Sequence, residues 1–222
     1  MWFGKSIPAA VLFDLDGTLI DSEPYWIKSE RELAEKHGAA WTQDDGDSLI
    51  GMSLYDSSRI IKERIGSDLE PQQIIDHLTS AVNEHLKREI PWRPGAKQLL
   101  RALKRRGVKT ALVTMSMRRT ALQVVEAIDF KAFDVVVAGD DVRHGKPHPE
   151  PYLKAAELLG VAASDCVAFE DSITGLLSAE AAGTKAVGIP NMMIIPQIEG
   201  RVLWPTLEGV GVKDLKQLFR NK

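Results

Sequence analysis

The sequence predicts an α/β fold in which a parallel sheet carries helices on both faces and a helical unit is inserted after the first strand. Over residues 94–189, helix-like segments alternate with short apolar segments, and such alternation implies parallel strands joined by right-handed crossovers. Residues 23–89 instead carry apolar residues at three- and four-residue spacing, which is typical of amphipathic helices. We therefore expect a sheet core built from residues 1–20 and 91–222, with a helical domain at 21–90.

The individual elements follow from the same patterns. The first strand is expected at residues 9–13, a continuous apolar run that stops at a polar Asp-Leu-Asp-Gly sequence. Pro91 and Pro94 mark the point where the chain leaves the insertion, and residues 191–211 show no clear pattern. The expected helices span 23–37, 55–65, 72–90, 96–106, 117–128, 149–159 and 173–182, and the remaining strands span 108–114, 134–138, 166–169 and 185–189.

The composition excludes several classes of protein. Hydrophobic residues make up 44% of the 222 residues, and 28 Lys and Arg nearly balance 31 Asp and Glu, which argues against a nucleic-acid partner. No apolar run approaches the ~20 residues that span a membrane, and no signal-peptide pattern is present. The single cysteine, Cys166, excludes an internal disulfide framework. We expect a cytoplasmic protein with a small-molecule partner, without nucleic acid or membrane, and of open oligomeric state.

Polar residues follow four of the predicted strands, where a parallel sheet is expected to bind ligands. The carboxyl ends of parallel strands meet at one edge of the sheet. Carboxylates that converge there raise one another's pKa values or require a cation between them. Mg²⁺ prefers oxygen ligands and would relieve this repulsion. The residues at these strand ends are Asp14 and Asp16, Thr114, Asp140 and Asp141, and Glu170 and Asp171.

These residue types can perform phosphoryl transfer, which needs a nucleophile, an acid for the leaving oxygen and positive charge around the phosphoryl oxygens. A carboxylate such as Asp14 is an accepted covalent nucleophile, and Asp16 can protonate the leaving group and later activate water. Gly17 permits a tight turn beside them. Thr114 can donate to a phosphoryl oxygen, and Lys146, in Gly-Lys-Pro-His-Pro, supplies a compact positive charge.

Four motifs resemble those of the haloacid dehalogenase-like hydrolase superfamily, and they occur in the same order. The resemblance is to its phosphatase branch with a small helical cap of C1 type, which includes β-phosphoglucomutase, phosphoglycolate phosphatase and sugar-phosphate phosphatases. It also covers the Asp-Ser-Glu-Pro sequence before the insertion, and so extends over residues 9–190. The motifs are Asp14-Leu-Asp-Gly-Thr18, Val113-Thr114, Lys146-Pro147 and Glu170-Asp171-Ser172.

The resemblance implies a Rossmann-like core, a helical cap domain at 21–90 and a Mg²⁺ cofactor. It also implies a reaction through an aspartyl-phosphate, with Asp14 as nucleophile and Asp16 as general acid and base. The implied metal ligands are Asp14, the backbone carbonyl of Asp16, Glu170 and Asp171, and the groups implied to hold the phosphoryl group are Thr114 and Lys146.

Several residues near these motifs have more than one interpretation. Glu23, at the entrance to the insertion, is expected to contact substrate hydroxyl groups. Ser116 would either contact the substrate or form a helix N-cap, with the cap as the preferred interpretation. The pair Asp140–Asp141 would either cap a helix or belong to the site. His144 and His148 flank Lys146 and are expected to have surface or packing roles.

The turn at residues 51–54 resembles the loop that selects substrates in this family, which makes Met52 a candidate substrate contact. Relatives that act on phosphorylated sugars often carry an arginine there to bind a phosphate, whereas the nearest here, Arg59, lies further along a helix. This argues against a doubly phosphorylated ligand. Trp26, on the predicted first helix of the insertion, more often packs in a core than lines a pocket.

The sequence therefore favours a Mg²⁺-dependent phosphatase acting on small phosphorylated metabolites, with a sugar phosphate expected first and phosphoglycolate or a nucleotide monophosphate behind it. Dehalogenation is disfavoured because the dehalogenase branch lacks the second aspartate, which is Asp16 here. The alternative reaction is that of a phosphomutase of the β-phosphoglucomutase type, which would use the same two aspartates. A non-catalytic sugar-phosphate-binding module is less favoured, because binding needs no nucleophile, acid/base and metal ligands together.

Overall fold

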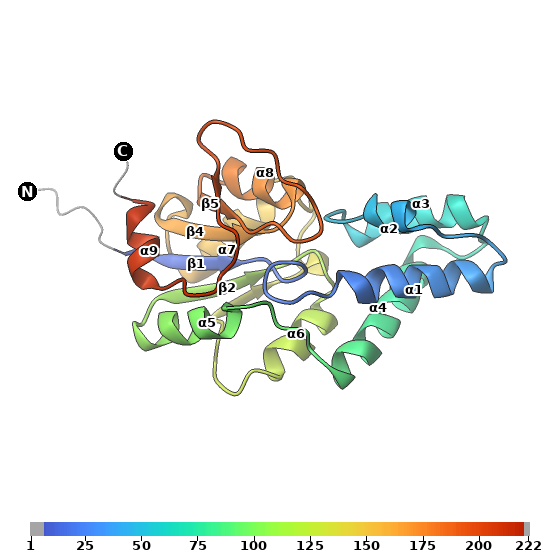
Figure 1. Ribbon diagram of the computed structural model, residues 1–222, viewed down its shortest axis with the longest axis horizontal. Coiled ribbons are helices and arrows are strands. Elements are labelled where there is room, and N and C mark those ends of the chain that lie inside the picture. Colours follow the sequence, from blue (N-terminus) through green and yellow to red (C-terminus); the bar gives the residue numbers. More distant parts are fainter. Residues whose placement is uncertain (1–6, 220–222) are drawn as a thin grey trace, which may run out of the picture.

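The computed structural model describes residues 7–219, and its centre is a six-stranded parallel sheet (Figure 1). The strand order is β3-β2-β1-β4-β5-β6, and each neighbouring pair is parallel. β1 therefore has a partner on each side, with Ala10 opposite Lys109 of β2 and Cys166 of β4. The strands are β1 (Ala10–Phe13), β2 (Lys109–Val113), β3 (Val135–Val137), β4 (Cys166–Glu170), β5 (Lys185–Gly188) and β6 (Val202–Leu203).

Helices cover both faces of this sheet, because successive side chains of a strand point to opposite faces. On one face Val11 and Phe13 pack with α5 and α6, and on the other Ala10 and Leu12 pack with α7 and α8. Burial on both faces explains why β1 is a continuous apolar run. The predicted α/β fold is confirmed. The helices of this core are α5 (Ala96–Arg105), α6 (Arg118–Glu126), α7 (Glu150–Leu159), α8 (Ile173–Ala181) and α9 (Val212–Gln217).

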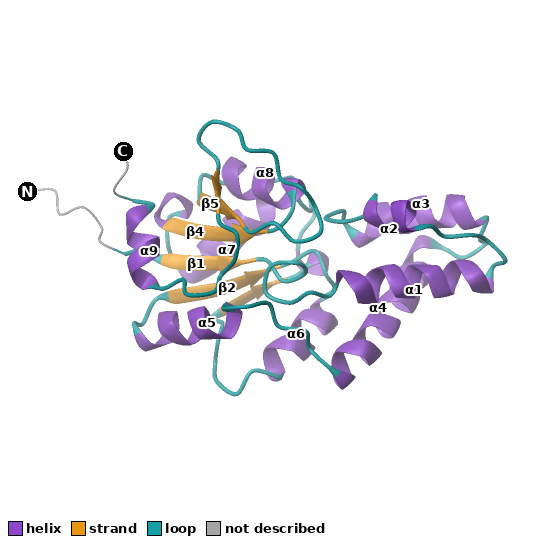
Figure 2. Ribbon diagram, viewed as in Figure 1, coloured by secondary structure: helices purple, strands orange, loops and turns teal. Residues whose placement is uncertain are grey.

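Four helices form the insertion and lie beyond the ends to which the strand arrows point (Figure 2). α4 contacts both α1 and α3. Among the described residues, no helix is long and apolar enough to cross a membrane. The short helix α2 was not predicted, because five residues are too few to show helical spacing. It begins at a capping box in which the Asp45 carboxylate accepts from Thr42 N–H at 2.7 Å. These helices are α1 (Glu23–Lys36), α2 (Gln43–Asp47), α3 (Leu54–Ile65) and α4 (Pro71–Arg88).

The segment 191–211, which gave no pattern in the sequence, packs along the connections between the core and the insertion. It adds β6 to the edge of the sheet, where Val202 lies opposite Val187. The side-chain amide of Asn191 donates to Asp21 Oδ1 at 2.8 Å, and Leu207 is fully enclosed in the core. The segment therefore fastens the last part of the chain to the first connection.

The two connections run side by side and are held by one arginine. The backbone N–H of Asp21 donates to Pro91 O at 2.8 Å, so the entry to the insertion touches its exit. The half-buried Arg93 guanidinium donates to the carbonyl of Gly17, to Ile189 O at 3.1 Å and to Pro190 O at 3.0 Å. Sequence reasoning missed Arg93, whose role is to tie the loop after β1 to the end of β5.

Gly95→Ala is expected to destabilise the protein more than Gly107→Ala. Both glycines have positive φ, 82° and 65°, so alanine strains either backbone by about 1–2 kcal/mol. A Cβ at position 95 would also lie 2.1 Å from Leu207 O, whereas one at position 107 meets nothing within 4 Å. Urea unfolding of both variants measures the difference. Equal losses of unfolding free energy in the two variants would show that segment 191–211 can move away from the new Cβ without destabilising the protein.

Candidate active site

The loop after β1 carries two aspartates to the carboxyl end of the sheet. The backbone N–H of Asp14 donates to Phe169 O at 3.0 Å, which extends the pairing of β1 with β4 by one residue. Gly17 then turns the chain with a φ of 77°, and its N–H donates to Ile20 O at 2.7 Å. Because a side chain is disfavoured at this φ, glycine makes the turn possible. The turn leaves both Asp14 and Asp16 lining one pocket.

The ammonium group of Lys146 links two buried carboxylates at the centre of the site. Its Nζ lies 2.6 Å from Asp14 Oδ1 and 2.6 Å from Glu170 Oε1, and it donates to Val113 O at 3.0 Å. Burial acts to lower the pKa of Lys146, but the two carboxylates outweigh it and raise the pKa. The Tyr152 hydroxyl also donates to Glu170 Oε1. No sequence pattern marks Tyr152 as a site residue, because its place on α7 is that of a packing residue.

Three carboxylates form a cluster that fits a hard divalent cation. Asp14, Glu170 and Asp171 each offer an oxygen, and these oxygens lie within 4.8 Å of one another. Asp14 Oδ2 and Glu170 Oε2 are buried without a hydrogen-bond partner among the described residues. Burial raises the pKa of Asp14 to about 7, against the opposing charge of Lys146, and burial also raises the pKa of Asp171. Unpaired oxygens in a buried anionic cluster are what Mg²⁺ would satisfy.

Two glycines provide the space that these carboxylates occupy. A Cβ at Gly17 would lie 1.9 Å from Asp171 Oδ2, and one at Gly175 would lie 1.9 Å from Glu170 Oε2. Gly175 stands in the first turn of α8, whose N-cap is the Ser172 side chain, accepting from Gly175 N at 3.0 Å. The positions of both acidic groups after β4 therefore depend on the absence of a neighbouring side chain.

Asp16 points away from this cluster and is oriented by four donors. Its Oδ1 accepts from Ser22 Oγ at 2.5 Å and from Trp26 Nε1 at 3.1 Å. Its Oδ2 accepts from Ser116 Oγ at 2.6 Å and from Thr114 Oγ1 at 3.3 Å. Trp26 was interpreted from the sequence as a core residue, but it also lines the pocket and donates a hydrogen bond to Asp16. The two carboxylates of the first loop have different surroundings, so they are suited to different chemical roles.

The segment after β2 explains the two ambiguous N-cap assignments. The preferred interpretation of Ser116 as an N-cap was wrong, since α6 begins after Met117 and the Ser116 hydroxyl bonds to Asp16 instead. The cap is supplied from the segment after β3, where Asp140 Oδ1 accepts from Arg118 N at 2.8 Å. Asp141 binds the Arg118 guanidinium and accepts from Ala138 N at 2.8 Å. Asp140 and Asp141 thus hold α6 and lie outside the carboxylate cluster.

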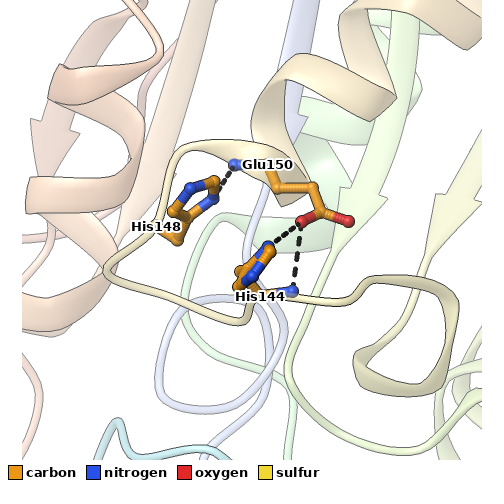
Figure 3. Close-up of side chains that lie close together, drawn as sticks. All are labelled: His144, His148 and Glu150. Carbon is orange, nitrogen blue, oxygen red and sulfur yellow. Dashed lines mark hydrogen bonds and ion pairs between the residues drawn. The ribbon is translucent and has the colours of Figure 1, made fainter.

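His144 and His148, which flank the lysine, lie on the surface beside Glu150 (Figure 3). Their rings are 4.7 Å apart. The Glu150 carboxylate accepts from Arg143 N at 2.8 Å, and from His144 N and Nδ1 at 3.1 and 2.8 Å. These bonds lower the pKa of Glu150 to about 2, with the Arg143 N–H as the first cause. Through these hydrogen bonds Glu150 holds the loop that carries Lys146.

The insertion forms the other wall of the pocket, which has a volume of about 80 Å³. Glu23 and Met52, both candidate substrate contacts, line it together with Ser116 of the core, and Met52 is 40% exposed. Glu30 of α1 also lines the pocket and was missed, because a glutamate on an amphipathic helix is normally solvated. All predicted site residues except Glu170, which is paired with Lys146, line this pocket.

The two glutamates on this wall are buried, and their pKa values are high. Burial raises the pKa of Glu23 to about 8, with the Asp16 and Glu30 charges adding to the effect. Burial raises the pKa of Glu30 to about 7, while the Trp41 indole opposes the shift. A raised pKa marks a carboxyl group for which water has been removed without a compensating cation.

Glu30→Gln is expected to gain stability relative to the wild type as the pH rises from 5 to 8. The folded protein binds the Glu30 proton more tightly than the unfolded chain, so wild-type stability falls between the ordinary pKa of 4.5 and about 7. At pH 8 the difference should approach about 3 kcal/mol. Thermal unfolding at several pH values measures it, with exposed Glu35→Gln as control. A Glu30→Gln difference that stays constant with pH would contradict the assignment.

The comparison with known proteins agrees with this geometry. Residues 11–189 match the family described as haloacid dehalogenase-like hydrolase. The chain is 35% identical to the phosphorylated carbohydrates phosphatase of Thermotoga maritima over 183 residues, 80% of this chain and 83% of that protein. It is 32% identical to the fructose-1-phosphate phosphatase YqaB of Escherichia coli over 182 residues, 82% of this chain and 96% of that protein.

A solved structure shows the same fold. A mutant of CbbY from Rhodobacter sphaeroides, in complex with xylulose-(1,5)bisphosphate, superposes with a TM-score of 0.81 at 26% identity and covers 92% of this chain and 97% of that chain. The family match spans five of the six strands, from β1 to β5, together with the insertion and every predicted site residue. The chain therefore belongs to the haloacid dehalogenase-like hydrolase family, and it is a phosphoric monoester hydrolase.

Proposed function

We propose that this protein is a Mg²⁺-dependent phosphatase that hydrolyses sugar phosphates through an aspartyl-phosphate on Asp14. The observation that carries the proposal is the arrangement of Asp14, with one oxygen held by Lys146 and the other unpaired, opposite a separately oriented Asp16. The names of the relatives that act on phosphorylated carbohydrates and on fructose 1-phosphate support the substrate class. A cytoplasmic location, with the lone Cys166 buried in β4, is part of the same proposal.

The reaction runs in two steps on the residues of the first loop. Asp14 Oδ2 attacks the phosphorus, the bond from phosphorus to the sugar oxygen breaks, and Asp16 gives its proton to that oxygen. Water then attacks the phosphorus, Asp16 takes a proton from it, and the bond to Asp14 breaks to release inorganic phosphate. Thr114 and Lys146 donate to the phosphoryl oxygens in both steps. The protonation state of Asp16 is restored at the end of each cycle.

Mg²⁺, when bound, would supply the positive charge that the phosphoryl oxygens and the carboxylate cluster both need. Asp14, Glu170 and Asp171 would hold it with their side chains, and Asp16 with its backbone carbonyl. The unpaired buried Oε2 of Glu170 supports this assignment. Of the three side chains, Glu170 is already bound by Lys146 and Tyr152, so its remaining oxygen, Oε2, is the one left for the cation.

We further propose that residues 21–90 act as a cap that opens to admit substrate. The pocket of about 80 Å³ is well below the ~300 Å³ at the lower end of small-molecule sites, so a sugar phosphate needs the insertion to move. The insertion already touches the core, because a Cβ at Gly51 would lie 3.0 Å from the Ser172 side chain. Glu23, Ser116 and Met52 are the proposed substrate contacts inside the closed pocket.

Asp14→Asn is expected to abolish phosphate release from sugar phosphates, since an amide is a poor nucleophile at phosphorus. Asp16→Asn should lower multiple turnover by at least about a hundredfold, because general acid catalysis is lost. Phosphate release with Mg²⁺ and with EDTA, from a panel of sugar monophosphates, is the measurement. Undiminished release by Asp14→Asn would refute the mechanism. Transfer of phosphate between sugar positions with slow release would make the protein a mutase.

Gly175→Ala is expected to raise the Mg²⁺ concentration needed for half-maximal activity by at least about tenfold. The new Cβ would overlap Glu170 Oε2 and displace a proposed ligand, although alanine suits a helix better than glycine. Gly183→Ala, just beyond the same helix and with nothing within 4 Å, is the matched control. A Mg²⁺ titration of activity separates the two. Equal requirements in both variants would remove Glu170 from the ligand set.

A further inference from the structure

The insertion contributes an anionic wall to the pocket. Glu23 and Glu30 lie seven residues apart on α1 and therefore share one face of the helix. Both line the pocket, and they are 8% and 6% exposed. Among the described residues that line it, Lys146 is the only cation, and it is already 2.6 Å from the carboxylates of Asp14 and Glu170. The insertion side of the pocket therefore adds acceptors and no positive charge.

Glu30 has an oxygen that the described residues leave unpaired. Its Oε2 is buried without a hydrogen bond of ordinary geometry to the described residues, although the Trp41 indole lies close enough to oppose the rise in its pKa. A Cβ at Gly46, another residue of the pocket wall, would lie 3.3 Å from that oxygen, so glycine keeps the space beside it open. Buried polar atoms are rarely left unpaired, because an unmade hydrogen bond in a buried site is costly. Glu30 lines the pocket, so a ligand that enters the opened pocket can supply the missing donor.

The arginines of α3 are occupied outside the pocket. Arg59 donates to the Tyr55 hydroxyl at 2.9 Å and lies over the same ring. Arg64 is paired with Asp45 on the surface. A second phosphate or a carboxylate at the insertion end would thus be buried beside two carboxyl groups without a counter-ion. Burial of an unpaired anion is strongly unfavourable, so such ligands are excluded by charge.

We infer that Glu23 and Glu30 form a subsite for neutral hydroxyl groups, which selects sugar and polyol monophosphates and rejects substrates with a second anionic group at the far end. The inference rests on the proposed function, because it takes the phosphate to lie at Asp14 and Lys146. Hydroxyl groups donate to the glutamate oxygens, and Ser57 and Trp26 line the same pocket. Glu23 and Glu30 determine specificity and take no part in bond breaking.

Binding to the Asp14→Asn protein in Mg²⁺ tests the subsite without any need for turnover. Fructose 6-phosphate and fructose 1,6-bisphosphate differ only by the second phosphate, and calorimetry should show the monophosphate bound at least tenfold more tightly. Adding Glu30→Leu should weaken fructose 6-phosphate by about ten- to a hundredfold, the effect of losing a hydrogen bond to a charged group. The affinity for inorganic phosphate should stay unchanged. Glu35→Leu, exposed on the same helix, is the matched control and should alter none of these affinities.

Three outcomes would overturn the inference: equal affinity for the two fructose phosphates, a Glu30→Leu protein with full affinity for the monophosphate, or an equal loss of affinity for inorganic phosphate. The first comparison needs no change in the insertion, so it decides the question even where Glu30→Leu does not fold. Release of phosphate from p-nitrophenyl phosphate by the wild type tests the proposed function separately. Selective binding without that release would refute hydrolysis and leave the hydroxyl subsite standing.

Discussion

The ion pair between Lys146 and the carboxylates of Asp14 and Glu170 is the interaction on which the site depends. It joins the ends of β1 and β4 to the loop before α7, and it lies where Lys146 is almost completely buried. Removing the ammonium group would leave two buried carboxylates without a counter-charge, which is far more costly than the pair itself is stabilising. Glu150 and Tyr152 both support this pair: Glu150 holds the loop that carries Lys146, and the Tyr152 hydroxyl donates to Glu170.

The parts of the structure that follow from local sequence patterns were predictable. β1 is apolar because it is covered on both faces, and the polar residue that follows it marks the end of the strand. Since parallel strands end at one edge of the sheet, the sequence alone predicts that Asp14, Thr114 and Glu170 lie close together. Lys146 could be named from the sequence as a source of positive charge, but it comes from a loop and no periodic pattern places it at the site. The repulsion among the converging carboxylates then indicated a bound cation and phosphoryl transfer.

The parts that depend on contacts between distant segments were not predictable. Arg93 looks like a solvated residue after Pro91, yet its guanidinium binds carbonyl groups of two loops. Segment 191–211 lacks helical or strand periodicity because its residues pack individually against connections. The sequence pattern of α1 does not distinguish Glu30 from a solvent-exposed glutamate. Only the placement of α1 over the strand ends shows that the side chain faces the pocket.

Asp16 has a further property that follows from its four donors. Thr114 and Ser116 belong to the sheet core, whereas Ser22 and Trp26 belong to the start of the insertion, so the two oxygens of one carboxylate are held by different bodies. If residues 21–90 move as proposed, the donors of Oδ1 would leave with the insertion while those of Oδ2 would stay with the sheet. The orientation of the proposed proton donor would then depend on closure, so closure itself would set when the acid can act.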